Sequence, residues 1–189
     1  MTLTIKLVTR CAIALLLLAA ASSLATAQLN SNAQPIALTA TLPESLTVGL
    51  SASAVTFNLT AGAAANPGNI GVTATTTWVL RPSRTTLRVY AYFANSAAAL
   101  SDGGAPANNI PSAAFFISNN GGASTAVNQS VVFGGANAGL QLSSTAITAA
   151  NRAGNRTDAM VFNINLTTLP QLPAGTYTGT LNIQAQATP

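Results

Sequence analysis

The chain has 189 residues, a formal net charge of +4 and a charged fraction of only 5%, where about 25% is usual for soluble domains. It contains no histidine, and its only lysine and only cysteine, Lys6 and Cys11, lie near the start. Proton transfer, nucleophilic attack and transition-metal binding depend on histidine, cysteine, lysine or clustered carboxylates. The composition therefore argues against an enzyme, a cofactor and a metal site. It also offers no basic patch for nucleic acid.

Residues 1–27 have the pattern of a secretory signal peptide. Lys6 and Arg10 precede a short apolar run, and Ala25-Thr26-Ala27 is a small-x-small cleavage site. We therefore expect export by the general secretory route and a secreted or cell-surface location. We expect no membrane insertion after the signal is cleaved, and a single domain spanning residues 28–189.

Apolar and polar residues alternate with period two along most of the remaining chain, which predicts strands. In chain order, the expected strands are residues 36–42, 46–50, 55–59, 70–80, 85–93, 114–118, 131–133 (the weakest), 140–147, 159–166 and 176–187. Turns rich in glycine, asparagine, proline and alanine separate them. About eight or nine short strands at this spacing predict an all-β fold, an antiparallel immunoglobulin-like β-sandwich.

Two antiparallel pairs are predicted from the alternation. The loop 81–84 would join the strands 70–80 and 85–93 as a hairpin, with Trp78 opposite Leu87 on the buried face. The outer face of this hairpin would carry a polar and aromatic contact face made of Thr73, Thr75, Thr77, Arg88, Tyr90 and Tyr92. The strands 159–166 and 176–187 are expected to form a second pair, with their apolar sets facing each other.

The run LPAGTYTGTL at residues 172–181 resembles the start of the last strand in secreted bacterial pilin-like sandwich proteins. These include the spore coat protein U-like and chaperone–usher fimbrial subunits, and residues 39–59 are similar to their first strands. The resemblance implies a structural role at the cell surface, with Tyr177 packed as a corner residue. The chain lacks the cysteine pair of these subunits, and only residues 28–34 precede the first expected strand, so no separate donor arm is expected.

The three carboxylates outside the leader have simple expected roles. Asp102 lies in a Ser-Asp-Gly-Gly run, which is expected to be a plain turn rather than a calcium site, because no second acid lies near it. Glu44 is expected to be a solvated turn residue rather than half of a glycosidase pair. Arg156 and Asp158 are expected to form a solvated ion pair of little energetic weight.

Two functional hypotheses remain. The first is a non-catalytic structural subunit, of the fimbria or coat type, that assembles by β-strand addition with itself or with other surface proteins. The inserting or first strand would carry Ile36, Leu38, Ala40 and Leu42. Its basis is the lack of lysine, a common device that protects exposed strand edges from such pairing.

The alternative is a monomeric extracellular module that binds carbohydrate or protein through the contact face around Tyr90 and Tyr92. The same residues have a plainer interpretation, because cross-strand tyrosine–threonine pairs also stabilise an exposed sheet.

Overall fold

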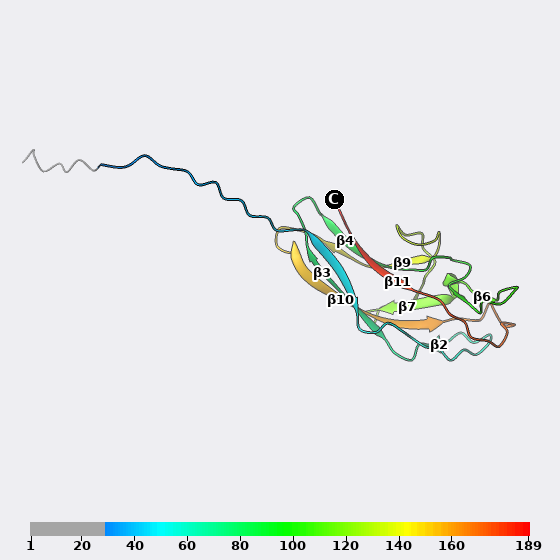
Figure 1. The fold of residues 1–189 in the computed structure, drawn as a ribbon. Coiled ribbons are helices and arrows are strands. Elements are labelled where there is room, and N and C mark those ends of the chain that lie inside the picture. Colours follow the sequence, from blue (N-terminus) through cyan, green and yellow to red (C-terminus); the bar gives the residue numbers. More distant parts are fainter. Residues whose placement is uncertain (1–28) are drawn as a thin grey trace, which may run out of the picture. The chain divides into compact units, whose positions relative to one another are not determined.

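The computed structural model describes residues 29–189, so the expected signal peptide lies outside the described residues. They divide into a segment that ends at Thr41 and a β-rich unit from Leu42 to Pro189 (Figure 1). All strand pairs of this unit are antiparallel, and its helical content is a single 3-10 turn, η1 (Ser112–Ala114). Within residues 29–189, no helix has the length and apolar character needed to cross a membrane. The all-β prediction is confirmed, and the two main sheets are consistent with a β-sandwich.

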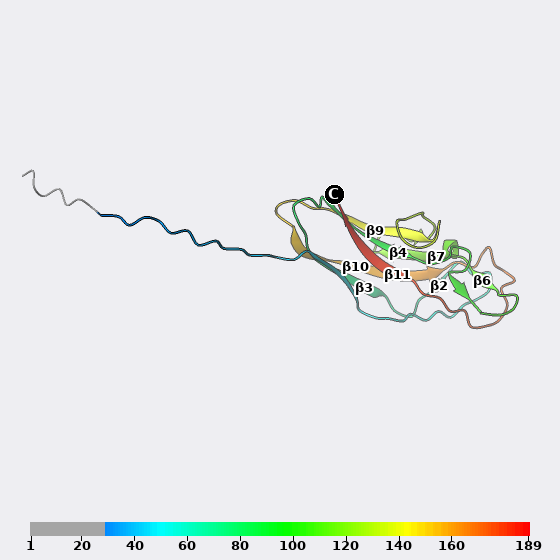
Figure 2. The same cartoon turned by 45° about the horizontal axis from the view of Figure 1, so that its top comes forward.

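The two main sheets are seen in Figures 1 and 2. The six-stranded sheet has the order β1 (Ser45–Leu50), β3 (Val72–Val79), β10 (Ala153–Ile164), β7 (Phe115–Asn119) and β8 (Thr125–Ala126), and β2 (Asn66–Pro67) also pairs with β10. The three-stranded sheet has the order β11 (Asn182–Thr188), β4 (Thr86–Tyr92) and β9 (Gly139–Ala146). A small third sheet consists of β5 (Leu100–Ser101) and β6 (Asn109–Ile110).

Both predicted strand pairs are wrong. β3 pairs with β1 and β10, whereas β4 pairs with β11 and β9, so the loop 81–84 crosses from one sheet to the other. Trp78 consequently lies opposite Leu46 and Gly154, not opposite Leu87. β10 and β11 likewise belong to different sheets. Period-two alternation shows which face of a strand is buried, but it does not show which strand lies beside it.

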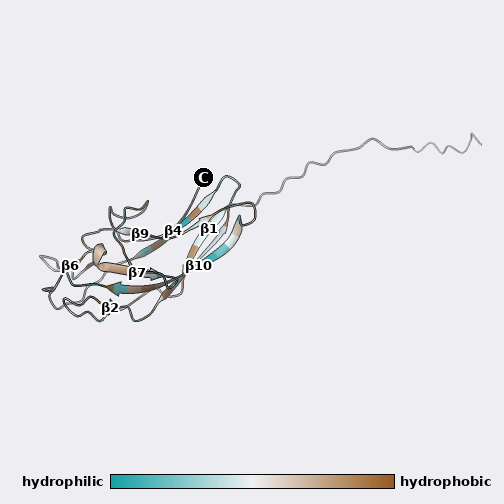
Figure 3. Cartoon of the chain, turned by 180° about the vertical axis from the view of Figure 1, so that it is seen from behind, coloured by the Kyte–Doolittle hydropathy of each residue, from teal (hydrophilic) through white to brown (hydrophobic). Residues whose placement is uncertain are grey.

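Most of the buried faces are as predicted. Trp78 is 4% exposed and packs in one cluster with Leu80 and Leu87. Leu80 precedes the loop 81–84 and Leu87 follows it, so the cluster spans both sheets. The indole N–H of Trp78 donates to the carbonyl of Asn151 at 2.9 Å, so its one polar group is satisfied. A larger cluster includes Phe115 and Phe162, and β7, which carries Phe115, is coloured as hydrophobic in Figure 3. Full burial of each such side chain contributes about 1.5–3 kcal/mol.

The first expected strand is absent. Residues 29–44 belong to no strand, and β1 begins at Ser45. In the segment 36–42 the large apolar side chains are almost fully exposed: Ile36 is 84%, Leu38 91% and Leu42 82% exposed. The described residues that precede the first strand are therefore 29–44, where the sequence had suggested only residues 28–34. Alternation makes a segment suitable for pairing, but it does not decide whether the segment pairs with a neighbouring strand.

Four other expected strands differ from the structure, and one of them, expected at 159–166, begins already at Ala153 in β10. Residues 55–59 form only an isolated bridge between Phe57 and Gly68, and residues 131–133 form no strand. The last strand is shorter than expected, because β11 begins at Asn182 rather than at residue 176. Before it, Thr178 pairs with Ser101 through two backbone hydrogen bonds of 2.9 Å.

Gly179 follows this bridge and is held close to the backbone of residue 99. A Cβ atom added at Gly179 would overlap the carbonyl oxygen of Ala99. We predict that Gly179→Ala destabilises the fold by about 1–3 kcal/mol, as other overpacked sites do. Urea unfolding followed by the fluorescence of Trp78 would measure this change. Gly49→Ala on β1 is the matched control, because no atom lies within 4 Å of the added Cβ there. A loss of the same size in both variants would contradict the prediction.

Candidate functional site

β11 has one unpaired edge among the described residues. Over its seven residues it pairs with β4, from Asn182 opposite Tyr92 to Thr188 opposite Thr86. Beyond this ladder, its backbone takes part in one further bond, in which the N–H of Thr85 donates to the carbonyl of Thr188 at 2.9 Å. The alternate N–H and C=O groups on the other side of the strand lack a partner within residues 29–189. Such an edge can accept another strand.

β1 is the neighbouring edge of the six-stranded sheet and lies beside β11. The inward side chains of this region pack on the core but remain only partly buried: Leu46, Val48, Leu181, Ile183, Ala185 and Ala187. The inward residues of β3 and β4 are much better covered, with Trp78 4%, Leu87 1% and Val89 1% exposed. We call the edges of β1 and β11, with these six side chains, the open margin.

The other edge of the three-stranded sheet is covered. Gln129 and Gly139 exchange two backbone hydrogen bonds of 2.7 and 2.9 Å at the start of β9. The side-chain amide of Asn119 donates to the carbonyl of Leu142, and that of Asn151 donates to the carbonyl of Ala146, both at 2.9 Å. Strand addition at this edge would have to displace these bonds, whereas within residues 29–189 no such bonds cover the open margin.

The exposed segment 36–42 has the pattern of a strand without a partner. Ile36, Leu38, Ala40 and Leu42 alternate with Ala37, Thr39 and Thr41, and prolines at 35 and 43 bracket the seven residues. We call residues 36–42 the arm. It has the same length as β11, and neither segment contains a charged residue. The arm and the open margin are thus two incompletely buried apolar surfaces on one chain.

The predicted contact face does not exist as one surface. Thr73, Thr75 and Thr77 point outward from β3 in the six-stranded sheet, whereas Arg88, Tyr90 and Tyr92 lie on β4 in the other sheet. The face depended on the hairpin that the structure does not contain.

The tyrosines on β4 are also partly covered by Phe133. This ring lies edge-on to Tyr90 at 5.7 Å between centroids, and Tyr90 is only 6% exposed. The Tyr92 ring lies 5.7 Å from the same phenylalanine, and its hydroxyl donates to Gln184 at 2.8 Å. The apolar run 131–133, expected to be a weak strand, instead supplies this cover.

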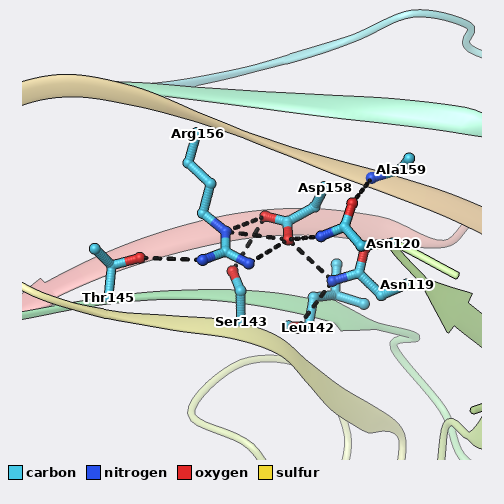
Figure 4. Close-up of polar contacts among 8 residues, drawn as sticks. All are labelled: Asn119, Asn120, Leu142, Ser143, Thr145, Arg156, Asp158 and Ala159. Atoms are coloured by element: carbon cyan, nitrogen blue, oxygen red, sulfur yellow. Dashed lines mark hydrogen bonds and ion pairs between the residues drawn. The ribbon is translucent and has the colours of Figure 1, made fainter. Parts of the chain in front are cut away.

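Asp158 is fully buried in a polar network, so the expected solvated ion pair is wrong (Figure 4). Arg156 donates to its carboxylate from Nε at 3.1 Å and from Nη2 at 3.0 Å. Asn119 on β7 donates at 2.9 Å, Ser143 on β9 at 3.1 Å, and Asn120 at 3.3 Å. The network joins the two sheets. The burial of Asp158 could have been predicted from its position. It lies two residues before the inward Met160 and four before Phe162, so it shares their face of the strand.

The surroundings of Asp158 favour its charged form. Burial raises the pKa of the carboxyl, but hydrogen bonds from Arg156 and Asn119 and the charge of Arg156 outweigh it, so the pKa lies below its usual value. A carboxylate with this many donors is stabilised as an anion and is a poor general acid. We interpret Asp158 as a structural residue.

The two remaining carboxylates lie in separate hydrogen-bond networks. Glu44 accepts from Nε of Arg81 at 2.9 Å and from Nε of Arg84 at 3.0 Å, so it ties the start of β1 to the loop 81–84 rather than being a free turn residue. The hydrogen bond from Arg84, with the charges of both arginines, lowers the pKa of Glu44. Asp102 is the turn residue that was predicted, accepting from Gly104 N–H at 3.0 Å and from the backbone and side chain of Asn108.

The described residues contain no group of three histidine, cysteine or acidic side chains that could hold a metal ion. No protein-family model matches the chain, and no curated protein or solved structure is significantly similar to it.

The Asp158 network predicts a defined acid sensitivity. Because the folded pKa is below the unfolded one, the stabilisation is fully present above about pH 4 and is lost as the pH falls through the folded pKa. Asp158→Asn weakens the buried hydrogen-bond network around a partly exposed Arg156 and is expected to cost about 1–3 kcal/mol at pH 7. Urea unfolding between pH 7 and pH 3 would show a flatter pH dependence for this variant. Asp102→Asn is the control, because Asp102 is a half-buried turn residue that forms no ion pair with the described residues. Equal losses in the two variants would contradict the prediction.

Proposed function

We propose that the protein is a secreted or cell-surface, non-catalytic structural subunit that assembles by β-strand addition. The arm of one copy pairs with the open margin of another, and the domain has an immunoglobulin-like arrangement of the kind found in fimbria or coat subunits. One observation carries the proposal: an exposed, alternating apolar segment occurs in a chain whose sandwich leaves the inward side chains of one margin only partly covered.

Strand addition would complete both surfaces at once. Burial of a side chain such as Ile36 or Leu38 contributes about 1.5–3 kcal/mol, whereas ordering each residue of the arm costs about 1–2 kcal/mol. The arm alone therefore gains little. The added strand also covers the partly buried side chains of the margin and pairs with free N–H and C=O groups at its edge, and these gains favour association.

The charge pattern supports the same proposal. Neither β1, nor β11, nor the arm contains a lysine, an arginine or an acid. Soluble sandwich proteins commonly place such charges on exposed edges to prevent pairing with other molecules. Nothing electrostatic opposes addition of the arm at this edge.

The alternative, a monomeric module that binds carbohydrate or protein, has less support. Its contact face is divided between two sheets, and Tyr90 is buried under Phe133. These observations favour assembly over binding through this face.

The proposal predicts that substitutions on the two faces of the arm differ in effect. Leu38→Lys places a charge on the face that enters the margin and is expected to weaken association by at least about tenfold, the equivalent of 1.4 kcal/mol. Thr39→Lys adds the same charge one residue later, on the opposite face, and is expected to change association little. Sedimentation velocity of residues 28–189 over a range of concentrations, followed by negative-stain microscopy, would measure assembly.

Both residues are exposed, so neither variant is expected to unfold the domain. Unfolding followed by Trp78 fluorescence serves as the control for stability. The proposal is contradicted if the wild-type protein remains monomeric at every concentration. It is also contradicted if the two lysine variants weaken association equally.

A further inference from the structure

We propose that the connection Pro43-Glu44-Ser45 prevents the arm from closing the open margin of its own copy, and so reserves this margin for the arm of another. This inference rests on the proposed function and concerns the regulation of the same site.

Self-closure is the main competitor of assembly. Only Pro43 and Glu44 separate the arm from the first residue of β1, Ser45. The arm could in principle fold back as a hairpin beside β1 and cover the same inward side chains. Because the effective concentration of a tethered segment reaches about the millimolar range, such a hairpin would outcompete addition between copies in dilute solution. Assembly therefore requires that self-closure be disfavoured.

The shortest possible hairpin loop, of two residues, would turn the threonine face of the arm toward the core. With a two-residue loop at 43–44, Leu42 would lie opposite Ser45, and Thr41 opposite Leu46. Directly opposite residues share a face of the sheet. Since Leu46 and Val48 point inward, this register would bury Thr39 and Thr41 and leave the apolar side chains of the arm in solvent. Pro43 opposes the loop as well, because its φ near −65° is incompatible with the positive φ that such turns need at the first position.

A three-residue connection would turn the apolar side chains of the arm inward, but its last position requires a residue that readily adopts the left-handed conformation. With a loop at 43–45, Leu42 would lie opposite Leu46, and Ala40 opposite Val48, all facing the core. Loops of this kind combine a type I turn, for which Pro43 is well suited, with a last residue in the left-handed region. That residue would be Ser45, which is not a glycine or asparagine. Ser45 is also already paired opposite Val79 at the start of β1. Residues 37–48 contain no glycine, asparagine or aspartate that could take its place.

Glu44 further restricts the connection. Its carboxylate accepts from Nε of Arg81, from the backbone N–H of Arg81 at 3.3 Å, and from Nε of Arg84. These bonds fix the middle residue of the connection on the loop 81–84. The ion pairs are partly exposed, so each contributes little on its own, and the turn chemistry at Pro43 and Ser45 is the main barrier. An arm from another copy has no connecting loop and can pair in the register that suits its apolar face.

A single substitution tests the inference. Ser45→Gly creates the loop Pro-Glu-Gly, which permits the left-handed residue and is expected to let each copy close its own margin. Ser45→Ala removes the same hydroxyl without permitting that conformation and is the matched control. Hydrogen exchange of residues 36–42 is measured at low concentration, and association by sedimentation velocity. We expect Ser45→Gly to slow exchange in the arm by more than about tenfold and to reduce association, whereas Ser45→Ala behaves like the wild type.

A second variant shows whether the protected strand is in the stated register. Adding Leu38→Lys to Ser45→Gly is expected to abolish the protection, because residue 38 enters the core of the closed hairpin. Unchanged fast exchange in the arm of Ser45→Gly overturns the inference, even if the wild type assembles. If the wild type does not assemble, the proposed function fails, and exchange in the arm still decides whether residue 45 controls self-closure.

Discussion

Burial of alternating apolar side chains between two antiparallel sheets is the interaction on which this domain depends. Residues 28–189 contain no cysteine, and only eight of them are charged, since Lys6 and Arg10 account for the other two of the ten in the whole chain. Neither disulfides nor many ion pairs can therefore hold the fold together. The sheets are instead joined where Trp78 meets Leu87 and where Phe93, directly after β4, meets Phe115 of β7.

The Asp158 network is the polar exception within this apolar interior. A buried carboxylate is tolerated because the donors of Arg156, Asn119 and Ser143 surround it. These partners come from strands of both sheets, so the network adds a directional contact to the non-directional packing around it. It also provides a buried group whose charge matters to stability, in a domain with few charges of any kind.

The open margin is the region of the domain where inward apolar side chains are not fully covered. The inward side chains of β1 and β11 have a core on one side and solvent on the other, and the arm carries apolar side chains with no core at all. The proposed strand addition would satisfy both, and under the proposed mechanism the short connection through Pro43 would determine which copy supplies the strand. A surface with so few charges is unusual for a soluble monomer. It is compatible with strand edges that pair with a strand of another molecule.

The all-β class and most of the buried faces could be read from the sequence, because the two-residue period of a strand is a local property. The alternation around Trp78 and around Met160 and Phe162 identified inward residues that the structure confirms. Strand partners could not be read in this way. β3 and β4 are adjacent in sequence and have matching apolar faces, yet the loop 81–84 crosses between sheets, and both outcomes bury the same side chains. The local pattern therefore cannot distinguish them.

The sequence by itself determined an all-β, charge-poor domain and the residues that form its core, since composition and period act on each segment separately. Only the tertiary structure decided the sheet order, the burial of Asp158, the division of the expected contact face and the unpaired state of residues 36–42. Each of these depends on which segments meet in space. Pairing over long sequence separations is set by the packing of the whole domain, because a strand edge is satisfied or left open by residues far away in the chain.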